Sequence, residues 1–188
     1  MIRAFISVDF DDKEIQDKIK NLQEEIESSE AHLRIVNPNI LHITLEFLGD
    51  LTEDQVEVVK EILNEIEFDS LKLIVKNPDV LPNENYIRVV YCELEGDIEP
   101  LKEIQRVLRD KLRKNGFRVD KRPFKPHLTI ARVKSAKNRK ELIRVIKQLS
   151  EASCGTQEIN TIKLKQSILK SEGPQYSNLH EIHAGTMK

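Results

Sequence analysis

The chain has 188 residues, 33% of them charged and 5% aromatic, with a net charge of −2, which indicates one soluble domain with an aliphatic core. Its apolar runs are too short for a signal peptide or a membrane span, so we expect a cytoplasmic protein without membrane attachment. Its two cysteines, Cys92 and Cys154, are too few for a disulfide framework or a thiolate zinc site, and we expect both to be reduced.

The first half of the sequence alternates strand-like and helix-like segments. Runs rich in strand formers predict strands at residues 2–8, 40–48 and 71–76. Between the first two, residues 11–30 place their apolar side chains on one helical stripe behind an Asp cap. A second helix is predicted to begin at Thr52, because Thr52 and Gln55 have the spacing of a capping box.

The second half repeats this order. Strands are predicted at residues 86–94 and 127–133, near 158–169 and at 178–184, and helices at about 99–115 and 138–150. Residues 77–85, rich in Asn and Pro, predict a loop, which we interpret as a hinge between the halves. The chain is therefore predicted to be a single α+β domain, residues 1–188, with two pseudo-duplicated lobes at about 1–76 and 86–188.

Each half contains the same short pattern, HITL from His42 to Leu45 and HLTI from His127 to Ile130. With five histidines and six threonines in the chain, chance would produce about 0.01 such repeats. Each motif is predicted to lie on the middle strand of its lobe. Residues two apart in a strand share a face, so each histidine points the same way as its threonine, and a pseudo-twofold axis would bring both pairs to one cleft.

Two imidazoles that face each other across a small gap can act as a concerted pair, one accepting a proton while the other donates one. A threonine hydroxyl beside each ring can donate a hydrogen bond to a charged oxygen. This arrangement suits a tetrahedral centre attacked from one side and released from the other, which points to phosphorus and requires no metal. A single His-x-Thr would more often be structural, and the duplication is what favours catalysis.

Charge is distributed unevenly along the chain. Residues 111–140, which include the second motif, hold twelve Lys or Arg against one acid, whereas residues 9–30 hold nine acids against three bases. The basic block is typical of a phosphate-binding surface, but a solvated basic face would have the same composition. Charge alone leaves both interpretations open.

Four segments together resemble one known family. They are RAFISVDF (3–10), NPNILHITLEFLGD (37–50), RPFKPHLTIARV (122–133) and GPQY (173–176). The paired HxTx motifs resemble those of the 2H phosphoesterase superfamily, and the surrounding residues are similar to its RNA 2′,3′-cyclic phosphodiesterases, also called 2′-5′ RNA ligases. The resemblance covers essentially the whole chain.

The resemblance implies a bilobal fold in which two antiparallel-type sheets line a central basic cleft with helices outside. It implies metal-independent and cofactor-free hydrolysis of RNA 2′,3′-cyclic phosphate ends to 2′-phosphates, and reversible ATP-independent 2′-5′ ligation. The expected partner is RNA with such ends, including tRNA fragments, and we expect a monomer. Carried onto this chain, His42 is the general acid, His127 the general base, and Thr44 and Thr129 hold the phosphate oxygens.

Of the further candidate residues, only Arg132 is carried over from the resemblance. Arg132 matches a phosphate-binding arginine, but it lies on the opposite strand face from His127 unless a bulge intervenes. Tyr176 is a candidate nucleotide contact, or part of a simple turn. Arg122 and Lys125 are candidate backbone-phosphate contacts, or solvated charges. His180 and His183 do not have the zinc-helix spacing, and we interpret them as structural.

The chain lacks the Trp that many relatives place before the first motif; Ile35 follows Arg34 here. A base would then stack on Tyr86, Tyr91 or Phe47, if on any ring. Alternative functions are a non-catalytic nucleotide- or RNA-binding module, a phosphodiesterase for another small cyclic phosphate, and a metal hydrolase using both motif histidines with Glu46.

Overall fold

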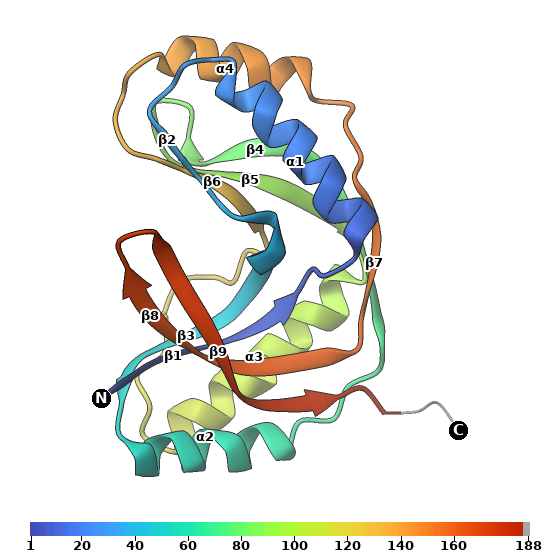
Figure 1. Ribbon diagram of the computed structural model, residues 1–188. Helices are drawn as coiled ribbons and strands as arrows, with labels where there is room; N and C mark the ends of the chain where they lie inside the picture. Colours follow the sequence, from blue (N-terminus) through green and yellow to red (C-terminus); the bar gives the residue numbers. More distant parts are fainter. Residues whose placement is uncertain (186–188) are drawn as a thin grey trace.

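A computed structural model describes residues 1–185 as two antiparallel sheets with helices on their outer sides (Figure 1), as expected for the α+β class. We call the four-stranded sheet, with strand order β3-β1-β8-β9, sheet A, and the five-stranded sheet, with order β2-β6-β5-β4-β7, sheet B. The strands are β1 (Ile2–Asp9), β2 (Leu33–Ile35), β3 (His42–Leu51), β4 (Leu71–Asn83), β5 (Tyr86–Gly96), β6 (Leu128–Val133), β7 (Gly155–Ile159), β8 (Thr161–Lys170) and β9 (Gly173–His183). The helices are α1 (Lys13–Glu27), the short 3-10 helix η1 (Pro38–Ile40), α2 (Glu53–Asn64), α3 (Ile98–Lys114) and α4 (Arg139–Gln148).

The helix ends follow local sequence signals. The Asp12 carboxylate accepts a hydrogen bond from the backbone N–H of Ile15, which caps α1. Thr52 and Gln55 form the predicted capping box at the start of α2, with both reciprocal hydrogen bonds present. Gly116, at a φ of +81°, follows the end of α3, where a left-handed conformation favours glycine.

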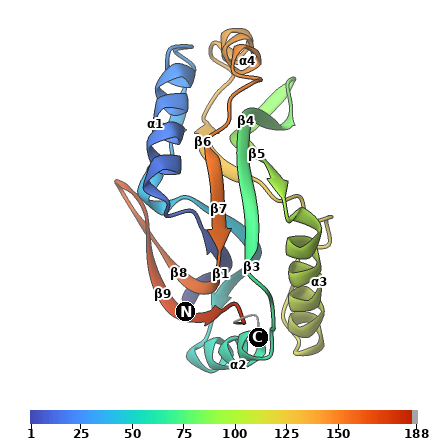
Figure 2. The same ribbon diagram turned by 90° about the vertical axis from the view of Figure 1, so that its right-hand side faces the viewer.

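The packing of helices α1 and α3 does not follow simply from the strand that precedes each of them. Although α1 follows β1 of sheet A, it packs with α4 over β6 and β7 of sheet B. In turn, α3 follows β5 of sheet B and packs against β3 of sheet A, β4 of sheet B and α2. Figure 2 shows α1 and α3 on opposite sides of the molecule. The chain crosses from sheet A to sheet B at α1, between β1 and β2, and again at α2, between β3 and β4.

These crossings overturn the predicted division into lobes. The expected halves were residues 1–76 and 86–188, but sheet A joins β1 and β3 to the last two strands of the chain, and sheet B takes β2 and β4 from the first half. In chain order each histidine motif lies at the middle strand of its half as predicted, although within the sheets β3 is an edge strand of sheet A and β6 is second in sheet B. The sequence repeat therefore does not coincide with sheet membership.

The predicted hinge at residues 77–85 is wrong. Residues 77–83 continue β4 and pair with β5 from Pro78 to Asn83, so only residues 84 and 85 form the turn. The prolines are tolerated because β7 pairs only with Leu71 to Val75. The outer part of β4 is thus an edge, where a missing N–H costs no ladder hydrogen bond.

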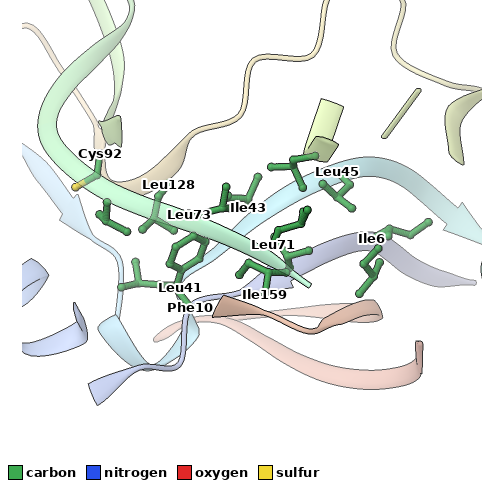
Figure 3. Close-up of a cluster of buried hydrophobic side chains, with 14 of the residues drawn as sticks. Ile6, Phe10, Leu41, Ile43, Leu45, Leu71, Leu73, Cys92, Leu128 and Ile159 are labelled. Carbon is green, nitrogen blue, oxygen red and sulfur yellow. The ribbon is translucent and has the colours of Figure 1, made fainter. Parts of the chain in front are cut away.

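The two sheets share one buried aliphatic cluster (Figure 3). Ile43, which follows His42, and Leu128, which follows His127, are 1% and 0% exposed and both belong to it. Because successive strand residues point to opposite faces, burial of these neighbours turns each histidine away from the core. Within residues 1–185, no helix is long and apolar enough to cross a membrane.

Candidate active site

His42 lies among aromatic rings on the face of sheet A opposite to that of the buried Ile43. It pairs in register with Asp9 of β1, and Thr44 pairs with Ser7, so the four side chains share one face. The His42 ring lies 5.1 Å from the ring of Phe5 and 5.3 Å, edge to face, from that of Tyr176. The predicted site residue Tyr176 is therefore part of β9 and contacts His42, and the segment from Gly173 is more than a turn.

Burial lowers the pKa of His42 below 6.5, and the positive charges of Lys165 and Arg132 act in the same direction. The hydrogen bond to Ile40 and the charge of Asp9 oppose this shift without reversing it. In the free protein, His42 is thus held neutral at neutral pH.

Three charged side chains on the same face form an ionic cluster beside His42. Asp9 accepts hydrogen bonds from Lys163, at 2.9 Å, and from Lys165, which is only 8% exposed. Burial opposes ionisation of Asp9, yet the hydrogen bonds and charges of the two lysines hold its pKa below 3.8. Ser7, on the same face of the sheet, is fully buried, and its hydroxyl has no hydrogen-bond partner within residues 1–185.

His127 has a different setting, at the entrance of β6 in sheet B. Its ring lies edge to face with Tyr91, 5.8 Å away, and Tyr91 pairs in register with Thr129. Tyr91 is 1% exposed and its hydroxyl donates to Asp79 at 3.4 Å. Lys125 lies over the Tyr91 ring with its Nζ 5.2 Å from the centroid, close to His127.

Both histidines are oriented by the same hydrogen bond. Nδ1–H of His42 donates to the carbonyl of Ile40 at 2.9 Å, and Nδ1–H of His127 donates to that of Lys125 at 2.7 Å. A carbonyl can only accept, so each neutral ring carries its proton on Nδ1. Within residues 1–185 neither Nε2 has a hydrogen-bond partner, which leaves both free for proton transfer.

A bulge solves the parity problem of Arg132. The β5–β6 register passes from Val90 opposite Ala131 to Tyr91 opposite Thr129, so β6 contains one extra residue. The buried pair Ile130 and Ala131 marks the place. Arg132 thereby regains the face of Thr129, as the condition derived from sequence required.

Two arginines of sheet B lie close to Tyr176, which packs against His42 in sheet A. Arg132 pairs in register with Arg34 of β2. Burial raises the pKa of Tyr176 above 10, while the charges of both arginines act to lower it. A Cβ at Gly173 would lie 3.1 Å from Nη2 of Arg34, so β2 and the start of β9 are in contact across the sheets.

A buried carboxylate, which the sequence suggested only as an acid of a metal hydrolase, connects the two histidine segments. Glu46 is 2% exposed and accepts hydrogen bonds from Arg109 at 3.0 Å, Gln105 at 3.1 Å and the backbone N–H of Asp120 at 2.9 Å. Arg109 also donates to the carbonyl of Arg122, at 3.0 Å. The strand of His42 thus anchors the segment that leads to His127.

The position of Glu46 overturns its predicted role as a metal ligand. A bulge at Leu45 shifts the β1–β3 register, so Glu46 pairs with Ile6 and faces α3 instead of sharing the face of His42. Among the described residues, no group of three His, Cys, Asp or Glu side chains is arranged to hold a metal ion.

The other predicted residues are more dispersed. Arg122 is committed to Asp120, whose pKa its hydrogen bonds lower to about 2. Phe47 is 67% exposed and pairs in register with Phe5, at a ring distance of 6.3 Å. His180 hydrogen-bonds Asn64 at 2.7 Å, and the His183 ring lies 3.4 Å from the Thr161 hydroxyl.

Comparison with known proteins is decisive for the family. Residues 4–183 match the family described as the AKAP7 2′5′ RNA ligase-like domain. The chain belongs to this family. Curated relatives include the RNA 2′,3′-cyclic phosphodiesterases of Archaeoglobus fulgidus, 36% identical over 95% of this chain and 98% of theirs, and of Methanothermobacter thermautotrophicus, 32% identical over 95% and 96%.

Solved structures of other proteins share the fold. A protein of Thermus thermophilus superimposes with a TM-score of 0.80 at 22% identity, covering 97% of both chains. E. coli LigT complexed with 3′-AMP gives a TM-score of 0.79 at 21% identity, covering 98% of this chain and 99% of LigT. The resemblance stated from the sequence, and the fold it implied, are confirmed.

Proposed function

We propose that this family member hydrolyses RNA 2′,3′-cyclic phosphate ends to 2′-phosphates with His42 and His127 as the acid–base pair. The observation that carries the proposal is the matched orientation of the two rings: each donates Nδ1–H to a carbonyl two residues earlier and leaves Nε2 free beside a threonine. The names of the archaeal relatives support the substrate class.

In the proposed reaction, Nε2 of His127 accepts a proton from water as the water oxygen attacks phosphorus. The bond between phosphorus and O3′ breaks, and Nε2–H of His42 donates its proton to the departing O3′, which leaves a 2′-phosphate and a 3′-hydroxyl. Thr44, Thr129 and Arg132 bind the non-bridging oxygens. The reaction needs no metal in this scheme, because the two imidazoles supply both proton transfers.

His42 must be protonated to act as the acid, although its environment lowers its pKa. A cyclic phosphate carries a negative charge, which would lie beside the ring and raise the pKa on binding. Substrate binding would thus favour the protonated form of His42, which is the form that acts as the acid. The same site could run the ligation direction when the 5′-hydroxyl of a second RNA replaces water, forming a 2′-5′ linkage without ATP.

The test is incubation of an oligoribonucleotide ending in a 2′,3′-cyclic phosphate with the protein and a chelator. We expect a 2′-phosphate, with a rate that the chelator does not change. A 3′-phosphate would overturn the assignment of the leaving oxygen, chelator sensitivity would support a metal hydrolase, and binding without turnover would support a non-catalytic module. Faster turnover of another small cyclic phosphate would change the substrate class.

We propose further that the protein acts as a cytoplasmic monomer on RNA fragments, including those of tRNA. Sedimentation of the protein with and without such RNA tests the monomer, and end-mapping of cellular RNA from a strain lacking the protein tests the substrate. Accumulation of 2′,3′-cyclic phosphate ends is the expected result.

A further inference from the structure

A pocket at the outer end of sheet B lies beyond the residues assigned above. It has a volume of about 140 Å³ and is lined by the start of β5, the end of β6 and residues 134–139, which lead into α4. Pockets that enclose small ligands usually measure about 300–1,000 Å³. This pocket is too small to enclose a nucleotide, and its size suits one group of a longer molecule that passes over it.

The pocket carries positive charge that acids do not neutralise. Arg88, Lys134, Lys137 and Arg139 line it, and within residues 1–185 none of them forms an ion pair. Several helix lysines elsewhere are paired, as Lys18 is with Glu14 and Lys102 is with Glu99. Arg139 donates to the carbonyl of Asn85 and ties α4 to the β4–β5 turn, whereas the other three cations remain available.

An exposed aromatic ring lies beside these cations. Tyr86 is 58% exposed, and the guanidinium carbon of Arg88 lies 5.1 Å from its ring centroid. Arg88 also donates to the Tyr86 hydroxyl at 3.3 Å, which holds the two side chains together. A ring and a cation at one place are the elements with which proteins bind single-stranded nucleic acid, by base stacking and by phosphate contact.

The strand β6 leads from the proposed active site to the pocket. His127 directly precedes this strand, Arg132 lies on its site face, and Lys134 follows it and donates its backbone N–H to the carbonyl of His32 at 2.8 Å. Seven residues at about 3.3 Å each separate His127 from Lys134 by at most about 23 Å. Figure 1 shows the β4–β5 turn and the segment after β6 at the same end of sheet B.

We propose that the outer pocket, defined by Tyr86, Arg88, Lys134 and Lys137, binds the RNA chain that leads away from the reacting terminus. An RNA strand supplies both groups that the pocket fits, phosphates for the lysines and a base for Tyr86. An acidic polypeptide would supply charge alone. The inference rests on the proposed function for the identity of the terminus, but RNA binding can be measured without turnover.

The kinetic test compares a nucleoside 2′,3′-cyclic phosphate with an octaribonucleotide that ends in the same group. We expect Lys134→Gln/Lys137→Gln to lower kcat/KM about tenfold for the octamer and to leave the nucleoside substrate unchanged. The control is Lys20→Gln/Lys72→Gln, which removes the same charge from exposed positions on α1 and at the other end of β4. A loss on both substrates, or on neither, would overturn the proposal.

The binding test uses a labelled octaribonucleotide without a cyclic phosphate, followed by fluorescence anisotropy at several salt concentrations. Each lost phosphate contact should reduce the slope of log K against log salt by about 0.7. Tyr86→Ala should weaken binding about tenfold, and Tyr86→Phe should retain it. These measurements stand even if the protein turns over no cyclic phosphate, so the two proposals can fail separately.

Two further results would overturn the RNA assignment. One is an unchanged salt slope in the lysine variant. The other is displacement of the octamer by polyglutamate as effectively as by an unlabelled oligonucleotide of equal charge, which would assign the pocket to an acidic protein. Equal melting temperatures of variants and wild type show that loss of binding does not reflect unfolding.

Discussion

The two histidines share a local pattern but occupy unlike surroundings. His42 packs against the rings of Phe5 and Tyr176, within a strand, beside an ionic cluster. His127 stands one residue before its strand, contacts the single ring of Tyr91, and follows a segment anchored through Glu46. Identical orientation with different enclosure suits two roles, because enclosure changes proton affinity while the Nδ1 hydrogen bond fixes the ring.

The cations also differ between the two sides. In sheet A, Lys163 and Lys165 are both paired with Asp9, whose one negative charge offsets half of their positive charge. In sheet B, neither Arg132 nor Arg34 forms an ion pair within residues 1–185. The cations without an ion pair therefore lie on the side of His127, while the aromatic surface lies on the side of His42.

Removing either imidazole is expected to have the largest effect. His42→Ala and His127→Ala should each lower kcat by about 10²–10⁴, because each variant loses one proton transfer. The double variant should lose much less than the product of the two effects, since the residues act as a unit. Single-turnover rates on a cyclic-phosphate oligonucleotide measure this.

Histidine variants outside the site provide the control for this prediction. His180 and His183 hydrogen-bond or contact other side chains of their own surface, and His180→Ala and His183→Ala should retain wild-type rates. Full activity in His42→Ala or His127→Ala would contradict the concerted pair.

Loss of the sheet B cation should have the next largest effect. Arg132→Met removes a charged hydrogen-bond donor worth about 1.5–3 kcal/mol, so kcat/KM should fall roughly 10–100-fold. Arg132→Lys keeps the charge but not the planar fork, and should fall between Met and wild type. If Lys165→Met were the more damaging change instead, the phosphate charge would be met from sheet A.

Features with local causes could be read from the sequence. The caps at Asp12 and Thr52 depend on residues three positions apart, and both are present as predicted. The three-residue strand β2 and the length of β4 were missed, because they depend on partners distant in sequence: Leu33 pairs with Val133, and Pro78 pairs with Cys92. Composition at these places indicates a loop until the partner strand is known.

The same division holds for the site. The paired motifs identified the histidines and threonines. The alternation of strand faces predicted that Arg132 needs a bulge to reach the face of Thr129, and the bulge is present. Asp9 and Lys165 were not found as site neighbours, and the orientation of Glu46 toward α3 was not foreseen, because strand pairing and two bulges in β3 decide what faces these residues. The available signal for Lys165 was the alternation of Ile162 and Leu164 with Lys163 and Lys165, which places both lysines on one face of a strand.

Enclosure of His42 can be tested through its pH dependence. A group whose pKa is lowered loses its proton at lower pH, so an acid role for His42 predicts that kcat/KM falls with rising pH through a pKa below 6.5. Tyr176→Ala opens the ring to water and should move that alkaline limb to higher pH, whereas Tyr176→Phe should leave it in place. NMR titration of His42 should show the same shift.

The alternative outcome is equally specific. If His42 is the base, its pKa sets the acidic limb, and Tyr176→Ala would move that limb and leave the alkaline one unchanged. The assignment of acid and base would then be reversed between the two sides. If His42 is the acid, bound phosphate raises its pKa. The alkaline limb of kcat should then lie at higher pH than the alkaline limb of kcat/KM.

The difference in exposure between the aromatic rings of the two sheets predicts which sheet holds the terminal base. Of the predictions, this one has the smallest expected effect. Tyr91 cannot stack a base, because it is 1% exposed and held by Asp79, whereas Phe47 is 67% exposed beside Phe5. Phe47→Ala should raise KM about fivefold, at the low end for base stacking at an open site, and Phe47→Tyr should not. Because every base has a ring face, the effect should be the same for all four terminal bases. An effect confined to one base would point to hydrogen-bond recognition instead of stacking.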